Sequence, residues 1–337
     1  MKIAIINDTH FGVRNDSQLF LDNFLNFFKN QFFPYIKKNE INTIIHLGDF
    51  VDRRKYVNFN TLNRIKSEFF EEIKKLDVSM HMIIGNHDTF YKNTNEINSP
   101  KELFSDYDFL KIYETPNKVV FGSCCIDMVP WICKENKDEV VNFIKNSKSD
   151  ILCGHLELSN HEVMRGVRFH GGMGDDIFSN YNKVLSGHFH IKSKNKNIFY
   201  LGTQYQLTFA DANEIKGFHI LDTEDLSLEF IENKDKMFYI IKDTDEIKDF
   251  SLFKNRYVKY IIDETVNNET LMKIEESNPY DLTVFENYEV KIEDKKVDLG
   301  KDTLTIINEE IDQLEIDLNK NELKTLIREV YLEALEQ

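Results

Sequence analysis

The chain has 337 residues, of which 41% are hydrophobic and 27 are phenylalanine. This length predicts two or three folding units. The hydrophobic content predicts a sizeable core and excludes a disordered chain. The formal net charge of -16 excludes a uniformly basic nucleic-acid coat. Residues 241–337 hold 13 Lys and Arg against 25 Asp and Glu, a net of -12, which leaves -4 for the first 240 residues. A site for a polyanion would therefore belong to the first part, where bound cations could reverse the local sign.

The four cysteines form no CxxC pair, which excludes a zinc knuckle and a dithiol redox motif. No apolar run approaches the ~20 residues that a helix needs to cross a bilayer. The chain opens on a short β-like run and not on a signal peptide. We therefore expect a reduced cytoplasmic protein with no membrane partner, located in the host cytoplasm if a phage encodes it.

Strand and helix signals alternate along the first two-thirds of the chain. The predicted strands are Lys2–Asn7, Ile41–Asp49, Ser79–Gly85, Ser123–Pro130, Ser149–Gly154, Asn182–Gly187, Asn197–Gly202 and Lys216–Asp222. Helical spacing predicts helices over Leu19–Lys38, which Pro34 should kink or end, and over Asn58–Leu76. This alternation predicts an α/β layered fold, in which sites lie beyond the carboxyl ends of strands.

Five of these strands are followed by a small polar cluster. In chain order the clusters are DTH (Asp8–His10), GDFVD (Gly48–Asp52), GNHD (Gly85–Asp88), GH (Gly154–His155) and GHFH (Gly187–His190). In four of them a glycine directly precedes the first polar residue, which suits a tight turn and a close approach of the backbone. Each polar residue by itself also fits a satisfied group at a strand end, but the ordered set of five favours a site.

Carboxylate, amide and imidazole ligands together suit a hard or borderline metal such as Mn, Fe, Zn or Mg. Seven candidate ligands are too many for one open catalytic ion, and they suit two ions ~3.5–4 Å apart that share a carboxylate. Such a pair binds phosphate oxygens and activates water. The clusters therefore predict hydrolysis of a phosphate ester.

The ordered motifs resemble the calcineurin-like metallophosphoesterase superfamily over about Met1–Asp222. The chain is further similar to the nuclease subunit of SbcC–SbcD type DNA-repair complexes, and to the small recombination endonuclease subunit of large tailed phages. Supporting stretches are DTHFGVRNDS (Asp8–Ser17) and FYLGTQYQLTFADANEIKGFHILD (Phe199–Asp222). The resemblance implies a four-layer sandwich of two mixed β-sheets flanked by helices. It divides the chain into a nuclease domain (1–222), a small α+β capping domain (223–298) and C-terminal helices (299–337).

The resemblance also implies roles for individual residues. The implied ligands are Asp8, His10 and His190 for one ion, Asn86, His155 and His188 for the other, and Asp49 as the bridge. His87 is implied to stabilise the transition state or to protonate the leaving oxygen. We expect Asp88 to orient His87 by accepting its hydrogen bond. Asp52 should support the ligands from behind; archaeal and eukaryotic relatives tend to have a histidine there, tied to exonuclease activity, whereas bacterial and phage relatives tend to have Asp.

Other residues are assigned less directly. Arg14, Arg53, Arg54 and Lys55 follow the first two motifs, so they are expected to contact DNA phosphates, with a solvated charge run as the alternative. The buried-strand histidines His46, His81 and His219 are expected to be structural. The loop-like region Ser159–Asn180 could shape a DNA groove.

The expected function is that of a two-metal DNA exo- and endonuclease using Mn²⁺, with Mg²⁺ as the alternative ion. An apolar stripe on Asn321–Gln337 predicts an amphipathic helix. The resemblance implies that this helix binds an SbcC-like ABC-type ATPase subunit, and the alternative is that it packs on its own capping domain. A homodimer is expected, with the helix Asn58–Leu76 as the candidate interface. The alternatives are a small-molecule or cyclic-nucleotide phosphodiesterase or phosphatase, and a non-catalytic scaffold.

Overall fold

The computed structural model describes residues 1–263, 267–286, 307–308, 311–312 and 319–335 of the chain. The chain divides into two compact units, residues 1–286 and residues 287–337, and each is described by itself. The expected boundary between residues 298 and 299 lies outside the described residues, so that boundary stays a prediction.

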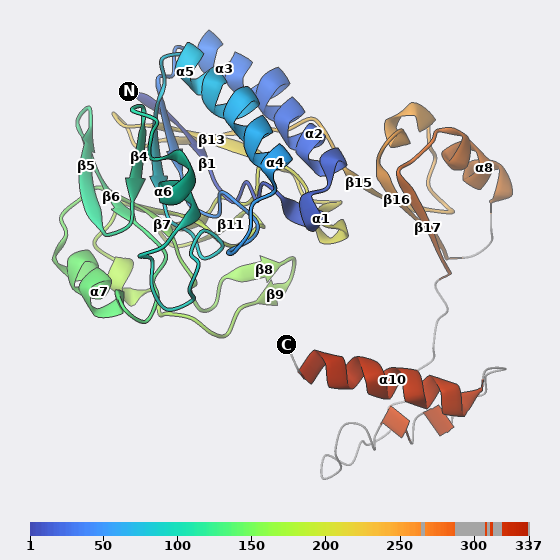
Figure 1. Cartoon of the computed structure of the whole chain (residues 1–337). Helices are drawn as coiled ribbons and strands as arrows, with labels where there is room; N and C mark the ends of the chain where they lie inside the picture. The colour runs from blue at the N-terminus through green and yellow to red at the C-terminus, as the bar shows by residue number, and fades with distance from the viewer. Residues whose placement is uncertain (264–266, 287–306, 309–310, 313–318, 336–337) are drawn as a thin grey trace. The chain divides into compact units, whose positions relative to one another are not determined.

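Two six-stranded mixed sheets form the body of the first unit (Figure 1). Across the first sheet the strands are β14 (Leu228–Glu232), β13 (Gly217–Asp222), β1 (Lys2–Ile6), β2 (Thr43–His46), β3 (Ser79–Ile83) and β4 (Leu110–Tyr113). Across the second sheet they are β11 (Ser193–Asn195), β12 (Ile198–Tyr200), β10 (Lys183–Gly187), β7 (Ile151–His155), β6 (Cys124–Val129) and β5 (Asn117–Phe121). All eight predicted strands are present. The edge strands β4, β5 and β11 were not predicted.

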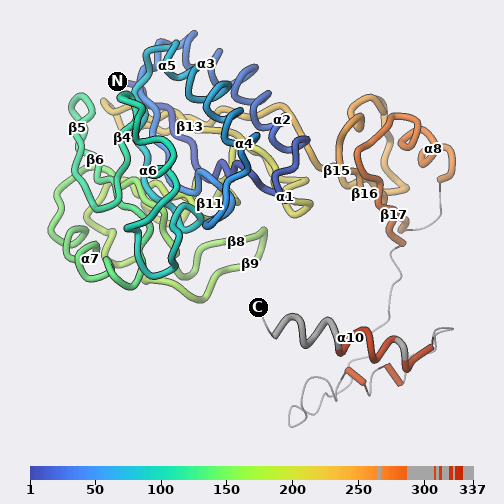
Figure 2. The backbone as a smooth tube through the Cα atoms, in the orientation of Figure 1, coloured from blue at the N-terminus to red at the C-terminus, as the bar shows by residue number. Residues whose placement is uncertain are grey.

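Parallel pairing brings the carboxyl ends of the central strands to one edge of each sheet. β1, β2, β3 and β4 run parallel in the first sheet, and β6, β7, β10 and β12 run parallel in the second. The first strand lies in the middle of its sheet, because β1 pairs with β2 on one side and with β13, two hundred residues later, on the other. In Figure 2 the yellow tube of β13 accordingly runs beside the blue tube of the N-terminus. The first and last motifs can therefore meet.

The two sheets pack face to face and each has helices on its outer face. Along β1 the side chains alternate: Ile3 and Ile5 join the apolar layer between the sheets, whereas Ala4 and Ile6 face the first helical layer. That layer contains α2 (Gln18–Phe27), η1 (Phe28–Phe32), α3 (Phe33–Lys38), α4 (Phe59–Arg64), η2 (Ile65–Phe70) and α5 (Glu71–Lys75). On the opposite side α7 (Lys137–Asn146) and η3 (Asp176–Phe178) cover the second sheet. The fold is the four-layer α/β sandwich that the motifs implied.

The first predicted helix does not end at Pro34. It runs from Gln18 to Lys38 with a π-helical segment at Phe28–Phe32, and Pro34 lies in the first turn of the following α-helical segment. The wide turn interrupts the regular hydrogen-bond ladder just where proline lacks its N–H, so the helix continues past it. The helix over Phe59–Lys75 contains a similar π segment at Ile65–Phe70.

A smaller parallel sheet follows the sandwich. Its strands are β15 (Phe238–Lys242), β16 (Tyr257–Ile262) and β17 (Asp281–Glu286), with η5 (Phe250–Phe253) and α8 (Asn268–Glu276) as connections. Residues 228–232 were expected to belong to this capping part. That grouping was wrong, because β14 pairs with β13 and extends the first large sheet.

The remaining elements are short, apart from one helix. They are α1 (Val13–Asp16), α6 (Ser99–Phe104), η4 (Phe209–Asp211), the hairpin of β8 (Glu162–Met164) and β9 (Val167–Arg168), and α10 (Lys320–Leu335) in the second unit. α10 agrees with the helix predicted at the C-terminus. Among the described residues, every helix is too short or too polar to span a membrane.

Candidate metal centre

The five polar clusters converge where the two sheets meet. Backbone hydrogen bonds tie the first two together, from Asp8 N to the Gly48 carbonyl (2.9 Å) and from His10 N to the Asp49 carbonyl (3.1 Å). The second sheet joins them through His155, whose Nδ1 lies 2.7 Å from the carbonyl oxygen of Leu47. The backbone N–H of His188 in turn donates to the Asp8 carboxylate at 3.1 Å. The site is therefore shared between both sheets.

Four of the expected ligands have a left-handed backbone. The φ angles are 48° at Asp8, 42° at His10, 55° at Asp49 and 85° at His188. Non-glycine residues adopt this region at a cost of about 1–3 kcal/mol each, and such strain concentrates at functional sites. The turns that aim these side chains inward are held against their local preference by the hydrogen bonds between clusters.

Two glycines permit the close approach of β2 and β3 at the site. A Cβ at Gly85 would lie 2.2 Å from the backbone nitrogen of Asp49. A Cβ at Gly48, where φ is +88°, would lie 2.7 Å from Nδ1 of His155. These contacts confirm the sequence argument that glycine precedes the polar residues because the backbone approaches closely there.

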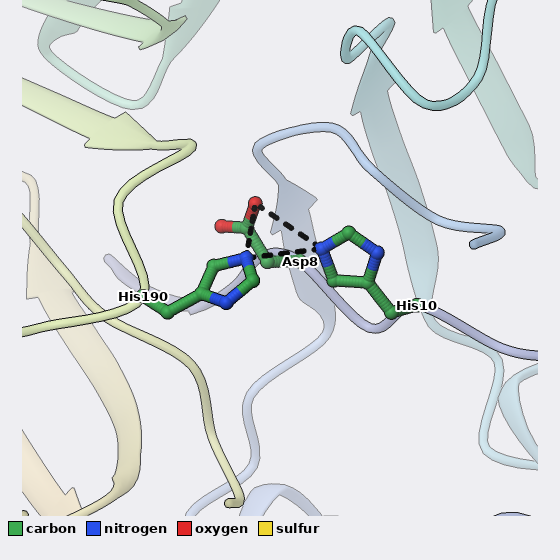
Figure 3. A group of neighbouring side chains, drawn as sticks. All are labelled: Asp8, His10 and His190. Atoms are coloured by element: carbon green, nitrogen blue, oxygen red, sulfur yellow. Dashed lines mark hydrogen bonds and ion pairs between the residues drawn. The ribbon is translucent and has the colours of Figure 1, made fainter. Parts of the chain in front are cut away.

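The first expected ligand set is brought together. Nε2 of His10 lies 3.1 Å from Nε2 of His190, and each nitrogen lies 4.0 Å from Oδ1 of Asp8 (Figure 3). Asp8 and His10 are buried. Three donor atoms from the ends of β1 and β10 thus face one small volume.

The second set lies beside the first. Oδ1 of Asn86 is 2.9 Å from Nε2 of His155 and 3.0 Å from Nδ1 of His188. Asp49 stands between the sets, since its Oδ2 is 3.3 Å from Nε2 of His155 and 3.8 Å from Nε2 of His10. This is the position that a bridging carboxylate needs.

These donors fit a pair of metal ions. Metal–ligand bonds of about 2.0–2.2 Å place neighbouring ligand atoms about 3–3.5 Å apart, which is close to the separations in both sets. A ligating histidine normally engages its second nitrogen with a carboxylate or a carbonyl. Here Nε2 of His188 lies 3.5 Å from Glu157, and Nδ1 of His10 lies 3.3 Å from Asp52.

Opposite charges compensate one another inside the site. Burial opposes ionisation of Asp49, but the imidazoles of His155 and His10 outweigh it and hold the pKa of Asp49 well below its ordinary value. Burial likewise lowers the pKa of His155, but the Asp49 carboxylate raises it to about 9. A divalent ion would take over this compensation and release the imidazole proton.

His87 and Asp88 correct one expectation. Nδ1 of His87 lies 2.6 Å from the carbonyl oxygen of Asp52, not on Asp88. The Asp88 carboxylate instead accepts backbone hydrogen bonds from Gly85 (2.8 Å) and from Asp49 and Phe50 (2.9 Å each). The prediction that Asp88 accepts the hydrogen bond of His87 was wrong, because loop amides already use both of its oxygens.

His87 also belongs to a group of neighbouring donor atoms with His10 and Asp49. Its backbone N–H donates to Oδ1 of Asp49 at 2.7 Å, and its ring packs edge-on to His10 with centroids 4.8 Å apart. His87 therefore lies at the site, on the side of the first ligand set.

The four expected DNA-contacting residues lie around the site with partners of their own. Arg53 pairs with Asp16 (3.3 Å), Arg54 donates to Thr89 (3.1 Å), and Lys55 lies over the ring of Phe90. These three border a hollow of about 150 Å³. Arg14 is separate, with its guanidinium over Phe20. Their phosphate contacts remain a prediction.

Several residues at the site were not predicted. Asn7 donates to Oδ2 of Asp8 (2.5 Å) and to the Gly202 carbonyl (2.9 Å), and buried Lys216 donates to the His190 carbonyl (2.7 Å). Glu157 and Trp131 contact His188. Asn7 and Glu157 lie within two positions of a motif residue, which is a weak signal. Trp131 and Lys216 carry no such signal, because only the fold brings them near.

The histidines expected to be structural are buried, as predicted. His46 contacts Thr9 Oγ1 (3.1 Å) and accepts from Gly48 N (3.2 Å), so it supports the first two clusters from behind. His81 and His219 lie in strands away from the ligands.

The four-layer fold and the two convergent ligand sets are those of a metal-dependent phosphoesterase. A family model described as calcineurin-like phosphoesterase matches residues 1–218. The chain is 33% identical over 343 residues to "Exonuclease subunit 1" of Enterobacteria phage T4, with 99% of each chain covered. It is 25% identical over 255 residues to the SbcD subunit of the SbcCD nuclease of Staphylococcus epidermidis, which covers 68% of this chain and 67% of that protein. This chain belongs to the calcineurin-like phosphoesterase family.

Proposed function

We propose that the chain is a two-metal DNA nuclease that hydrolyses phosphodiester bonds as exonuclease and endonuclease, in break processing, recombination and replication. The observation that carries the proposal is Asp49, which lies between two convergent ligand sets. The similarity to a phage exonuclease subunit along nearly the whole chain supports DNA as the substrate. We assign Mn²⁺ as the ion, with Mg²⁺ as the alternative.

In this proposal Asp8, His10 and His190 hold one ion, Asn86, His155 and His188 hold the other, and Asp49 holds both. When bound, the ions supply Lewis acidity toward the phosphate and activate water for attack. The side chains deliver these ligands from two sheets and from strained turns, so the site is organised before the substrate arrives.

His87 acts as the general acid in this proposal. The Asp52 carbonyl can only accept, so Nδ1 of His87 carries a proton and its hydrogen bond fixes the ring. Nε2 then carries a proton only in the imidazolium form, which is the form that can protonate a leaving oxygen. Asp52 and Asp88 act as positioning residues. Asp52 orients His87 and His10, and Asp88 holds the amides of the ligand loops.

The partners follow from the same relatives. We assign DNA as substrate, an SbcC-like ABC-type ATPase that binds the C-terminal helices, and a second copy of this chain. The staphylococcal relative is by its name one subunit of a nuclease, which supports a second protein subunit as partner by analogy. Tyr56, just before α4, is 71% exposed, and Phe59, the first residue of α4, is 86% exposed. These two exposed aromatic residues support α4 as the dimer interface. The host cytoplasm is the assigned location.

Cleavage of linear double-stranded, single-stranded and hairpin DNA tests the function. Wild type and His87→Ser are compared in Mn²⁺ and in Mg²⁺, with a chromogenic phosphodiester alongside. We expect Mn²⁺-dependent DNA cutting that falls about 10²- to 10⁴-fold in His87→Ser. Hydrolysis of the small ester without DNA cutting, even with an ATPase partner added, would favour a small-molecule phosphodiesterase instead.

A further inference from the structure

Trp131 is the one tryptophan of the chain, and it lies against the second ligand set. The centroid of its ring is 5.3 Å from that of His188 and 6.0 Å from that of His155. The side chain is half-buried. A large flat ring that stays partly exposed beside the candidate ligands can contact a bound molecule with the surface that remains free.

The backbone of Trp131 is held firmly. Its N–H donates to the Ile84 carbonyl (2.7 Å), directly before the cluster of the third motif. Its carbonyl accepts from the side-chain amides of Asn95 (2.9 Å) and Asn136 (3.0 Å). The backbone that carries the ring is therefore fixed relative to the ligand loops, so a group stacked on the ring would lie at a defined place beside the proposed metal ligands.

A hollow of about 390 Å³ opens beside the ring. It is lined among others by Trp131, Ile132, Lys134, Lys137, Glu157 and Met173. The volume is within the range of small-molecule sites, and its floor combines an aromatic ring with aliphatic side chains. Lys134 and Lys137 are exposed at its border.

The charges in the hollow set the orientation of an occupant. The Glu157 carboxylate faces His188 at 3.5 Å and would repel a phosphate placed deep in the hollow. The two lysines at the border attract phosphates. An occupant with an uncharged flat ring and flanking phosphates fits this arrangement, and a nucleotide strand has that chemistry.

We propose that Trp131 is the stacking platform for an unpaired nucleobase next to the scissile phosphate, and that Lys134 and Lys137 contact phosphates of the same strand. The inference rests on the proposed function and deepens it. A base must leave its duplex to stack on a side chain, so the site takes single-stranded or frayed DNA ends. Stacking accepts any base, so the preference is for strand state and not for sequence.

The experiment uses the tryptophan itself as the probe. Full-length protein in the slow His87→Ser background is titrated with a thymidine octamer in Mg²⁺, and tryptophan emission is followed. We expect saturable quenching, because the only emitting indole lies at the site. An emission that stays unchanged while the octamer binds by a second method overturns the inference.

Variants separate stacking from packing. Trp131→Leu should weaken octamer binding about 5- to 100-fold, as for loss of one base–aromatic stack. Trp131→Tyr keeps a flat face and should recover most of the affinity. Calorimetric titration with Mn²⁺ is run on each variant. If Trp131→Leu loses Mn²⁺ binding in parallel with DNA binding, Trp131 only positions the histidines, and the inference fails.

The salt dependence of octamer binding tests Lys134 and Lys137 separately from Trp131. Lys134→Ala with Lys137→Ala should lower the slope of log affinity against log salt by about 1.4, from two single-strand phosphate contacts. The control is Lys37→Ala with Lys38→Ala, two exposed lysines at the end of α3, which should leave the slope unchanged. Equal slopes for both pairs would contradict the lysine assignment.

Cleavage of blunt and frayed DNA ends distinguishes failure of this inference from failure of the proposed nuclease function. If wild type cuts DNA in Mn²⁺ and cuts frayed ends no faster than blunt ends, the nuclease stands and the unpaired-base site does not. If wild type neither binds nor cuts DNA, the proposed function fails and takes the inference with it.

Discussion

At the level of single residues, several buried polar groups hold the site by filling hydrogen bonds and not by reacting. Asp88 is the clearest case, since its carboxylate accepts from backbone amides at Gly85, Asp49 and Phe50. Burial and the neighbouring Asp49 raise the pKa of Asp88 to about 7, against these hydrogen bonds. The loops of the second and third motifs thus donate their backbone hydrogen bonds to the same carboxylate, that of Asp88.

Asp88→Ala should destabilise the fold by about 2–4 kcal/mol, because it leaves buried amide groups without an acceptor. Urea unfolding at neutral pH measures the change. Asp106→Ala, at an exposed loop position, is the control and should stay within about 0.5 kcal/mol of wild type. A loss for Asp88→Ala no larger than the control would contradict the bridging role given to its carboxylate.

His219 makes stability depend on pH at a position away from the ligands. Burial, with a smaller effect of Lys192, lowers the pKa of His219 to about 3. The unfolded chain therefore binds this proton more readily than the folded chain below about pH 6.5. Stability from the neutral imidazole is present above about pH 6.5 and is lost as the pH falls toward the folded pKa of about 3.

The free energy of unfolding falls between pH 7 and pH 5, and in His219→Gln this fall should be about 1–2 kcal/mol smaller than in wild type. The reason is that glutamine binds no proton in either the folded or the unfolded chain. Urea unfolding at the two pH values gives this difference. His170→Gln, at an exposed histidine, is the matched control and should keep the wild-type dependence. Identical pH dependence for wild type and His219→Gln would refute the assignment.

Among the secondary-structure elements, the ends of β2 and β3 matter most for the site, because it depends on how closely they approach. Gly85 permits this approach, because any side chain there would collide with the backbone of Asp49. The collision involves backbone atoms, so no side-chain rotation can relieve it.

Gly85→Ala should weaken Mn²⁺ binding at least about 10-fold, because Asp49 and the loop that carries Asn86 must separate. Calorimetric titration measures the affinity. Gly174→Ala is the control, since a Cβ there meets nothing within 4 Å, and it should bind like wild type. Equal affinities for the two variants would show that the approach is not needed for the site.

For the molecule as a whole, two of the proposed association events bear on stability and oligomeric state: the binding of metal ions, and the binding of one chain to another. The proposed metal ligands come from both sheets, so two bound metal ions would tie the sheets together. Any species that binds the folded state but not the unfolded state raises the free energy of unfolding, by an amount that grows with the logarithm of its concentration relative to its dissociation constant.

Mn²⁺ at about 100 times its dissociation constant should raise the free energy of unfolding by about 2.7 kcal/mol per site, and a chelator should remove this gain. Thermal unfolding with and without the ion gives the measurement. Asp49→Asn weakens the shared ligand and should abolish most of the shift. A shift of wild-type size in Asp49→Asn would argue against a bridging carboxylate.

Phe59→Glu should shift the chain from dimer to monomer, because it replaces the exposed aromatic side chain of α4 with a charged one in the proposed interface. Sedimentation over a range of concentrations measures the association. Leu252→Glu, at an apolar residue outside α4 that is 52% exposed, should leave the association unchanged. A wild-type dimer in Phe59→Glu would place the interface elsewhere.

Local patterns in the sequence determined much of this protein. Apolar runs of strand length predicted the eight strands, and the polar clusters at the ends of five of them predicted which polar residues meet, because strand ends in α/β folds gather at one edge. The positions of Asp8, Asn86 and His190 follow from that rule. Short edge strands such as β5 carry too little pattern to be seen.

Only the tertiary structure decided what lies around these ligands. The hydrogen bond from His87 to the Asp52 carbonyl, the use of Asp88 by loop amides, and the ring of Trp131 on His188 join residues from different strands and loops. These contacts depend on how β2 lies against β3 in the first sheet and how β6 and β10 are placed in the second. No local spacing encodes that placement, because the strands of each pair are distant along the chain.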